Sequence, residues 1–170
     1  MTMLSIRRAE GKDAGALAEL AERTFVATYA ADNTPENLAA HCRETYSESI
    51  QAEEIANPRI TTLVGEENGE LVAYAQLRWG AAPACVTASK PIEVGRFYVD
   101  STRHGTGVAR ALMTECLRFA ASASADAVWL GVWEHNPRAI AFYRKSGFLP
   151  VGEHTFAVGS DVQRDVVMVR

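Results

Sequence analysis

The amino-acid sequence predicts an α/β protein in which seven strands and several helices form one domain over residues 1–170. Three observations carry this prediction. Strand and helix patterns alternate from residue 91 to the C-terminus, two β-rich runs flank a tight-turn signal within residues 59–79, and residues 127–133 form a continuous apolar run. Such a run is typical of a strand covered on both faces, so we expect helices on both faces of a mixed sheet.

The N-terminal half is expected to begin with a short strand at residues 4–9 and a helix over residues 12–29, where apolar residues follow helical spacing. Thr34 is a candidate N-cap for a second helix, and a third short helix is expected over residues 48–56. A hairpin follows, because the pair Asn68-Gly69 favours a tight primed turn between two β-rich runs.

The C-terminal half predicts a strand at residues 91–99, a helix at 107–122 and a strand at 127–133. A strand-helix-strand unit of this kind is normally a right-handed crossover, so these two strands are expected to be parallel. Asn136 is a candidate cap for the next helix and Gly147 its stop signal, and the remaining tail supplies two more strands.

Composition excludes several classes of protein. The formal net charge of −4 argues against binding to nucleic acid, which requires many cations that neutralise phosphates. Cys42, Cys85 and Cys116 are far apart and have no metal-ligand spacing with the histidines, so we expect no metal site and reduced thiols in a cytoplasmic protein. The N-terminal residues lack a signal-peptide core, and no 18-residue apolar run predicts a membrane span.

The turn "RHGTGVAR" precedes the helix expected at residue 107 and has the composition of a phosphate cradle. The first four amides of a helix have no partner within the helix and carry partial positive charge. Gly105 and Gly107 would let a ligand approach that backbone, while Arg103 and His104 add positive character. The alternative is a turn that needs glycine for its dihedral angles alone. A Rossmann site fits poorly, because its third glycine would fall on Arg110.

Two motifs resemble those of a known superfamily. The stretch "HGTGVARALM" resembles the Q/R-x-x-G-x-G/A signature of the GNAT acetyltransferases, and "NPRAIAFYRKSGF" resembles their later N-x-x-A-x-x-F-Y-x-x-x-G-F motif. The order and separation of the motifs are right, and the resemblance spans essentially the whole chain. His104 stands where Gln or Arg is usual. The stretch "TYAADNTPENL" and the ending "HTFAVGSDVQRDVVM" look similar to the bacterial spermidine/spermine N-acetyltransferase branch.

The resemblance implies acetyl-CoA as cosubstrate and a sheet whose two central parallel strands splay apart to admit pantetheine. Gly95, inside a predicted strand, suggests a bulge that would help to separate these strands, and the alternative is that this glycine only relieves crowding. By carry-over from the family, the pantetheine arm would bind the backbones of Phe97, Tyr98 and Val99. The diphosphate would bind the turn formed by His104, Gly105, Thr106, Gly107, Val108 and Ala109. Asn136 would contact the cofactor as well, although it is also a sufficient helix cap without any ligand.

The implied reaction is attack of an amine on the thioester. Glu93 matches the position of a general base in some members of the superfamily, and the alternative is a solvated carboxylate or one paired with Arg96. Tyr143 matches the family tyrosine placed near the sulfur, where it would protonate the departing thiolate. The backbone N–H of Phe97 is the expected oxyanion donor.

The acceptor is expected to be a small amine, with a polyamine as the leading candidate. Nine acidic residues and two arginines lie between Asp32 and Glu70, a net charge of −7 that would attract a polycation. Solvated helix faces explain the same charge without a ligand. The aromatic residues Trp79, Trp133 and Tyr29 either line an amine pocket or pack in the core.

Two other functions are compatible with the sequence. One is a CoA-binding regulatory protein without turnover, and the other is acetylation of a protein N-terminus or lysine. Neither a membrane nor nucleic acid is an expected partner, and a homodimer is compatible with the sequence.

Overall fold

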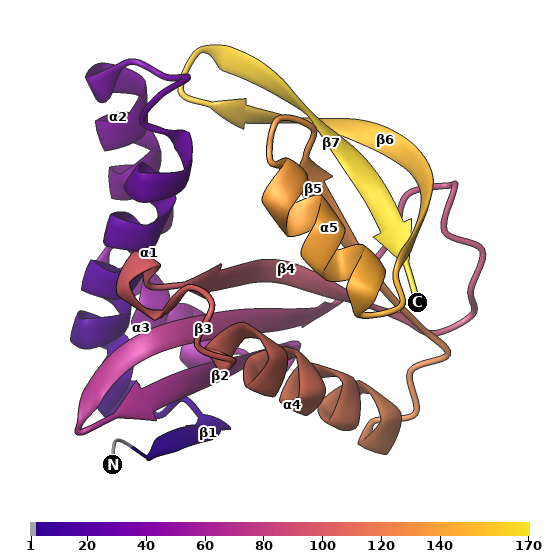
Figure 1. Ribbon diagram of the computed structural model, residues 1–170, viewed down its shortest axis with the longest axis horizontal. Coiled ribbons are helices and arrows are strands. Elements are labelled where there is room, and N and C mark those ends of the chain that lie inside the picture. The colour runs from indigo at the N-terminus through magenta and orange to yellow at the C-terminus, as the bar shows by residue number, and fades with distance from the viewer. Residues whose placement is uncertain (1–2) are drawn as a thin grey trace.

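The computed structural model describes residues 3–170, and Figure 1 shows how their helices and strands are arranged. The elements in chain order are β1 (Leu4–Arg8), α1 (Ala14–Tyr29), α2 (Pro35–Thr45), α3 (Glu48–Ala56), β2 (Ile60–Glu67), β3 (Glu70–Trp79), β4 (Pro91–Val99), α4 (Val108–Ser122), β5 (Ala127–Trp133), α5 (Pro137–Lys145), β6 (Leu149–Val158) and β7 (Asp161–Val169). Short 3-10 turns at Gly11–Asp13 and Ser101–Arg103 precede α1 and the glycine turn.

The strands form one seven-stranded sheet in the order β1-β2-β3-β4-β5-β7-β6. β4 and β5 are paired in parallel, whereas all other neighbouring strands are antiparallel. The helix α4 connects the two parallel strands, as the strand-helix-strand pattern predicts. The prediction of a mixed, mostly antiparallel seven-stranded sheet with a central parallel pair is therefore confirmed.

The two parallel strands separate toward their C-terminal ends. Their pairing ends at Glu93 and Trp129, although both strands continue beyond these residues. A bulge lies just past this point, because Val94 and Arg96 pair with consecutive residues of β3 and leave Gly95 unmatched. The bulge predicted from the glycine is therefore present where the strands begin to splay.

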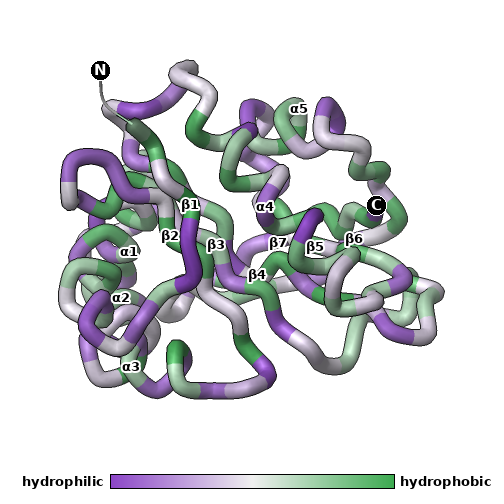
Figure 2. Tube along the Cα trace, turned by 90° about the horizontal axis from the view of Figure 1, so that it is seen from below, coloured by the Kyte–Doolittle hydropathy of each residue, from purple (hydrophilic) through white to green (hydrophobic). Residues whose placement is uncertain are grey.

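Helices cover both faces of the sheet. α1, α2 and α3 lie on one side of β1–β4, and α4 and α5 lie on the other (Figure 2). Each face has its own apolar core. Because of the bulge, Val94 and Phe97 contribute to the core under α4 and α5, whereas Tyr98 contributes to the core under α1 and α2. The bulge thus decides which β4 side chains meet each set of helices.

Local signals in the sequence place the ends of several elements correctly. The side chains of Thr34 and Asn136 each accept a hydrogen bond from the amide three residues ahead, as N-caps do. Asn68 and Gly69 have φ of 53° and 82°, the left-handed values of a primed hairpin turn. The helix expected from residue 12 begins at Ala14, because a 3-10 turn occupies the residues before it.

Candidate functional site

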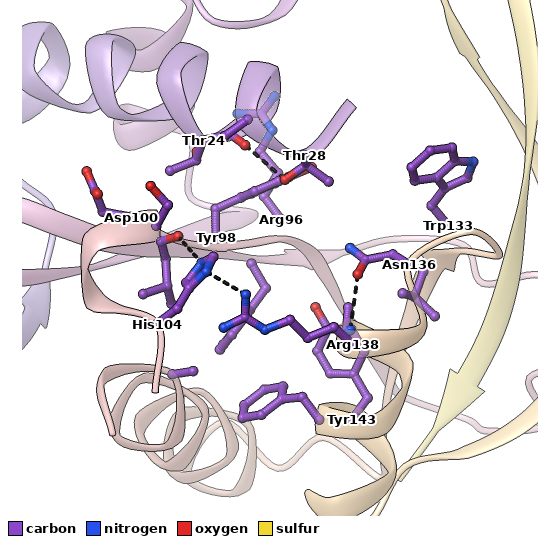
Figure 3. Close-up of a pocket in the computed structure, with 18 of the residues that line it drawn as sticks. Thr24, Thr28, Arg96, Tyr98, Asp100, His104, Trp133, Asn136, Arg138 and Tyr143 are labelled. Atoms are coloured by element: carbon purple, nitrogen blue, oxygen red, sulfur yellow. Dashed lines mark hydrogen bonds between the residues drawn. The ribbon is translucent and has the colours of Figure 1, made fainter. Parts of the chain in front are cut away.

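A cleft of about 630 Å³ opens where β4 and β5 separate. One wall is β4 from Val94 to Val99, and the other walls come from the end of β5, the start of α5 and the side of α1 that carries Thr24 and Thr28 (Figure 3). The glycine turn borders the same cleft. The structure therefore joins the splayed strands, the glycine turn and the first turn of α5 in one site.

The turn between β4 and α4 has the backbone geometry of an anion site. Gly105 and Gly107 have φ of 78° and 91°, in the left-handed region that glycine adopts without strain. A Cβ added to either glycine would meet no atom within 4 Å, so both positions face open space. Gly107 is the N-cap of α4, where the helix dipole favours negative charge.

Four of the six residues predicted to form the cradle, those between 104 and 109, line the cleft. The amides of His104 and Thr106 donate within the turn, each to a carbonyl at 3.3 Å. Thr106 does not line the cleft, and Val108 is buried in the core under α4. The predicted cradle residues that line the cleft are His104, Gly105, Gly107 and Ala109. The start of α4 therefore borders the cleft at Gly107 and Ala109.

His104 forms a bridge across the mouth of the cleft (Figure 3). Its Nε2 lies 3.0 Å from the carbonyl oxygen of Val99, and its Nδ1 lies 2.6 Å from Nη1 of Arg138 on α5. A guanidinium only donates, so Nδ1 accepts from Arg138 and Nε2 carries the hydrogen that Val99 accepts. The sequence prediction did not include Arg138. Its position two residues after the Asn136 cap places it in the first turn of α5, and this was the signal that could have indicated it.

Tyr143 lies in the wall that α5 contributes. The residue is 8% exposed, and its ring packs edge-on against Phe97 and Phe148. Burial raises the pKa of its hydroxyl well above the ordinary value for tyrosine. The hydroxyl therefore keeps its proton at neutral pH and is able to give it to a stronger base.

The remaining residues predicted to bind cofactor also border the cleft. Phe97, Tyr98 and Val99 lie on its β4 wall, on the part of the strand beyond the last pair with β5. Asn136 lines the cleft while its side-chain oxygen accepts the amide hydrogen of Ala139 at 3.1 Å. The helix cap predicted for Asn136 is therefore present. Its contact with the cofactor stays a prediction, and its position beside the cleft is compatible with that contact.

Glu93 lies where the parallel pairing of β4 and β5 ends. It is not among the residues that line the cleft, although the next residue, Val94, is. Burial raises the pKa of the Glu93 carboxyl, and the charges of Arg78 and His154 oppose that rise. A carboxylate with a raised pKa is a better proton acceptor than an exposed one.

A buried ion pair supports the α1 side of the cleft. The guanidinium of Arg96, which is 8% exposed, donates to both carboxylate oxygens of Glu54 at 2.7 and 3.0 Å. Gln76 donates a further hydrogen bond to Glu54, and Arg96 lies 5.0 Å from the centre of the Tyr46 ring. Glu54, not Glu93, is therefore the partner of Arg96.

The aromatic residues considered for an amine pocket do not all meet. Trp133 and Tyr29 both line the cleft, and their ring centroids are 4.9 Å apart. Trp79 does not line it, because its ring packs under the Lys90 ammonium, 5.1 Å away. Two of the three residues thus belong to the site.

The acidic segment contributes less charge to the cleft than its composition suggests. Its ion pairs with arginines from other segments are Glu54–Arg96, Glu66–Arg7 and Glu67–Arg103. Asp32 is the member of the segment that lines the cleft. The arginines in the lining are Arg23, Arg96, Arg103, Arg110 and Arg138. The cleft is therefore not a strongly acidic surface.

Across residues 3–170, no helix combines the length and the apolar composition that a membrane crossing requires. In the same part of the chain, no three or more His, Cys, Asp or Glu side chains are grouped to hold a metal ion.

A sheet that splays around a cleft in this way is the fold of known acetyltransferases, and the sequence matches that class as well. The model of the acetyltransferase (GNAT) family matches residues 17–148. An uncharacterized N-acetyltransferase of Mycobacterium tuberculosis H37Rv is 37% identical over 158 residues, which cover 93% of this chain and 97% of that protein. The N-alpha-acetyltransferase RimI of the same strain is 35% identical over 100 residues, 58% of each chain.

Among solved structures, the PaiA N-acetyltransferase from Thermoplasma acidophilum, in complex with coenzyme A, has a TM-score of 0.80. It is 22% identical and the match covers 99% of this chain and 98% of that one, which shows the common fold. The chain belongs to the acetyltransferase (GNAT) family and is an acyltransferase, as the two motifs predicted. The spermidine/spermine branch stays a prediction.

Proposed function

We propose that the protein transfers the acetyl group of acetyl-CoA to the primary amine of a small molecule, by direct attack of the amine on the thioester. The observation that carries the proposal is the meeting of three features in one cleft: the free edge of β4, the glycine turn and the buried hydroxyl of Tyr143. Family membership supports acetyl transfer, and the coenzyme A complex of the Thermoplasma protein supports the cosubstrate.

The cleft offers separate groups for the two ends of coenzyme A. The start of α4 suits the diphosphate, because its amides and dipole favour an anion and Gly107 adds no side chain. Arg138 would add a cation from the side of α5, and so make up for the absence of the usual Gln or Arg at residue 104. The backbones of Phe97, Tyr98 and Val99 would take the pantetheine arm.

The side chains around the cleft suit proton transfer in both directions. An alkylammonium has a pKa near 10.4, so the amine must lose a proton before it attacks. Glu93 would accept that proton through water, and the amide of Phe97 would donate to the thioester oxygen as charge develops there. Tyr143 would give its proton to the departing thiolate, since a thiol with a pKa of about 8.5 leaves more readily when it is protonated.

The cleft has room for a small amine, but the charges of its lining do not identify which amine it is. Trp133 and Tyr29 offer apolar surface for an alkyl chain, and Asp32 offers one carboxylate for a second ammonium group. A polyamine is therefore an acceptor to assay, although the arginines of the lining would oppose a chain with many positive charges.

A second candidate acceptor is the α-amino group of a protein. The identity to the N-alpha-acetyltransferase RimI over 100 residues favours it. An assay with short peptides that have free N-termini separates it from the first, because a small-amine enzyme would leave them unmodified.

The test is release of free CoA from acetyl-CoA with a panel of polyamines, other alkylamines, amino acids and peptides. We expect one class of amine to support turnover. The variant Tyr143→Phe should lower kcat by at least about tenfold, with unchanged affinity for CoA by calorimetry. Tyr74→Phe is the matched control, because Tyr74 is buried and does not line the cleft, and the substitution keeps the ring that stacks on Tyr98. Equal turnover in Tyr143→Phe and wild type would remove the proposed acid, and an absence of CoA binding would remove the proposed function.

A further inference from the structure

The middle of β5 carries a glycine whose side-chain position is occupied by residues from two other strands. Gly131 lines the cleft and lies between Trp129 and Trp133 on the same face of the strand. A Cβ on Gly131 would lie 2.6 Å from Nε2 of His154 and 2.8 Å from Oδ2 of Asp165. The two side chains therefore lie directly across this glycine, which leaves no room for a larger residue.

His154 on β6 and Asp165 on β7 are neighbours across the hairpin. Nε2 of His154 lies 3.3 Å from Oδ2 of Asp165, while Oδ1 of Asp165 is buried and has no hydrogen-bond partner in the described chain. Burial raises the pKa of the Asp165 carboxyl above its ordinary value, and the histidine opposes that rise. A carboxylate that holds one ring nitrogen orients the imidazole and leaves the other nitrogen for a second partner.

The pair lies close to the carboxyl group already placed at the point of splay. Glu93 is the register partner of Trp129, whose ring meets the His154 ring edge-on with 6.3 Å between centroids. The charge of His154 also lowers the pKa of Glu93, opposing the effect of burial. The other titratable groups facing this region are Tyr29 of α1, Tyr143 of α5 and, against Gly152 on β6, Cys85.

The facing strand β4 has a similar arrangement with the opposite charge. A Cβ on Gly95 would lie 2.8 Å from Nε of Arg78, so the guanidinium crosses this glycine. Arg78 donates from Nε and Nη2 to the side-chain oxygen of Gln76. A fixed cation near the amine disfavours its ammonium form. Each splayed strand therefore has a glycine crossed by a side chain from a neighbouring part of the sheet: Arg78 of β3 lies against Gly95, and His154 of β6 with Asp165 of β7 lies against Gly131.

We propose that the His154–Asp165 pair takes the proton that the acceptor amine loses before it attacks the thioester. This inference rests on the proposed function and adds a second group to Glu93. Because His154 lies behind Gly131 and does not itself line the cleft, the ammonium gives one proton to the imidazole through a water molecule. The neutral nitrogen then bonds to the acyl carbon as the carbon–sulfur bond breaks. Tyr143 protonates the sulfur and regains a proton from the nitrogen, so that an acetamide, a free thiol and an imidazolium result.

A purely structural pair would hold the β6–β7 hairpin and nothing more. It would change stability without changing how the rate depends on pH. A proton-accepting pair would instead change how the rate depends on pH. It would leave cofactor binding unchanged, because Gly131 lies on the β5 wall whereas the turn proposed for the diphosphate lies at the end of β4. Coenzyme A binding should then be preserved in variants that turn over slowly.

The test compares His154→Gln and Asp165→Asn with Glu153→Gln, an exposed neighbour on β6. Steady-state rates are measured from about pH 6 to pH 10, and CoA affinity by calorimetry. We expect kcat of His154→Gln to fall about 100-fold at neutral pH and to recover as pH rises toward the pKa of the amine, because the variant depends on the neutral fraction of its substrate. Asp165→Asn should lose about tenfold, since it keeps the imidazole but loses its orientation. Glu153→Gln should match wild type.

Wild-type kcat and an unchanged pH profile in His154→Gln would overturn the inference. If that variant does not fold, as circular dichroism would reveal, Asp165→Asn decides in the same way. If the wild-type protein releases CoA with none of the amines in the panel, the proposed function is wrong, and the role of the pair is wrong with it.

Discussion

The glycine turn and the ion-pair wall border the same cleft but are built in different ways. The turn consists of consecutive exposed residues, 104–107, and offers the backbone at the start of α4. The wall joins side chains from three elements, Glu54, Gln76 and Arg96, which satisfy one another away from water. The turn offers backbone groups to an anion, whereas the wall is made of side chains that already bond to one another, with Arg96 in the lining of the cleft.

The largest effect expected from this contrast is on stability. Glu54→Gln removes the negative charge from a guanidinium that is 8% exposed, and an unpaired buried charge costs about 3 kcal/mol of unfolding free energy. Urea unfolding measures the loss. The affinity for CoA should stay within twofold of wild type, because the turn shares no residue with the wall.

Glu53→Gln is the control for that measurement, since Glu53 is exposed on the same helix and should change stability by less than about 0.5 kcal/mol. A large loss of CoA affinity in Glu54→Gln would contradict the contrast, because it would show that the wall also determines the shape of the turn.

A smaller effect is expected from a substitution in the glycine turn, and it should weaken the binding of CoA as well as lower stability. Gly107→Ala forces an L-residue to φ of 91°, which costs about 1–2 kcal/mol, while the added methyl group meets no protein atom within 4 Å. The strain should turn the first amides of α4 away from the ligand and raise the Kd for CoA about tenfold. Calorimetry with Gly80→Ala as control checks this, since a Cβ on Gly80 also meets open space and its φ is not left-handed. Unchanged affinity would mean that the diphosphate lies elsewhere.

The sequence predicted the parts of the molecule that depend on residues close together in the chain. Asn68-Gly69 indicated a hairpin, Asn136 indicated the start of a helix, and the two glycines in "RHGTGVAR" indicated the glycine turn. Gly95 indicated a bulge because glycine is unusual inside a strand. The parallel pair followed from a general rule on crossover connections.

The acceptor side was beyond such reasoning because its contacts join distant segments. Glu54 and Arg96 are 42 residues apart, and nothing local in α3 indicates their pairing. His154 and Asp165 reach Gly131 from the C-terminal hairpin. One signal was present: a glycine among large apolar residues in "VWLGVW" indicates close approach of another side chain, but not which one.

The smallest effect tests whether the turn acts alone or with α5. Arg138→Gln removes an exposed cation that contacts Nδ1 of His104, and exposed charge contacts are worth at most about 1 kcal/mol. The Kd for CoA should therefore rise roughly threefold to fivefold, whereas the Kd for pantetheine, which has no diphosphate, should not change. Arg144→Gln, an exposed arginine at the other end of α5, is the control.

A loss shared equally by CoA and pantetheine would mean that Arg138 acts by holding His104 against Val99, and so by shaping the β4 edge. The double variant with His104→Gln separates the two roles. If Arg138 contacts phosphate directly, its effect should persist when His104 is replaced, because the guanidinium loses only its resting partner. If it acts through His104, the second substitution should abolish the effect of the first. The first result would place the diphosphate between two elements, α4 and α5, and show that the backbone turn needs a side chain from outside its own segment.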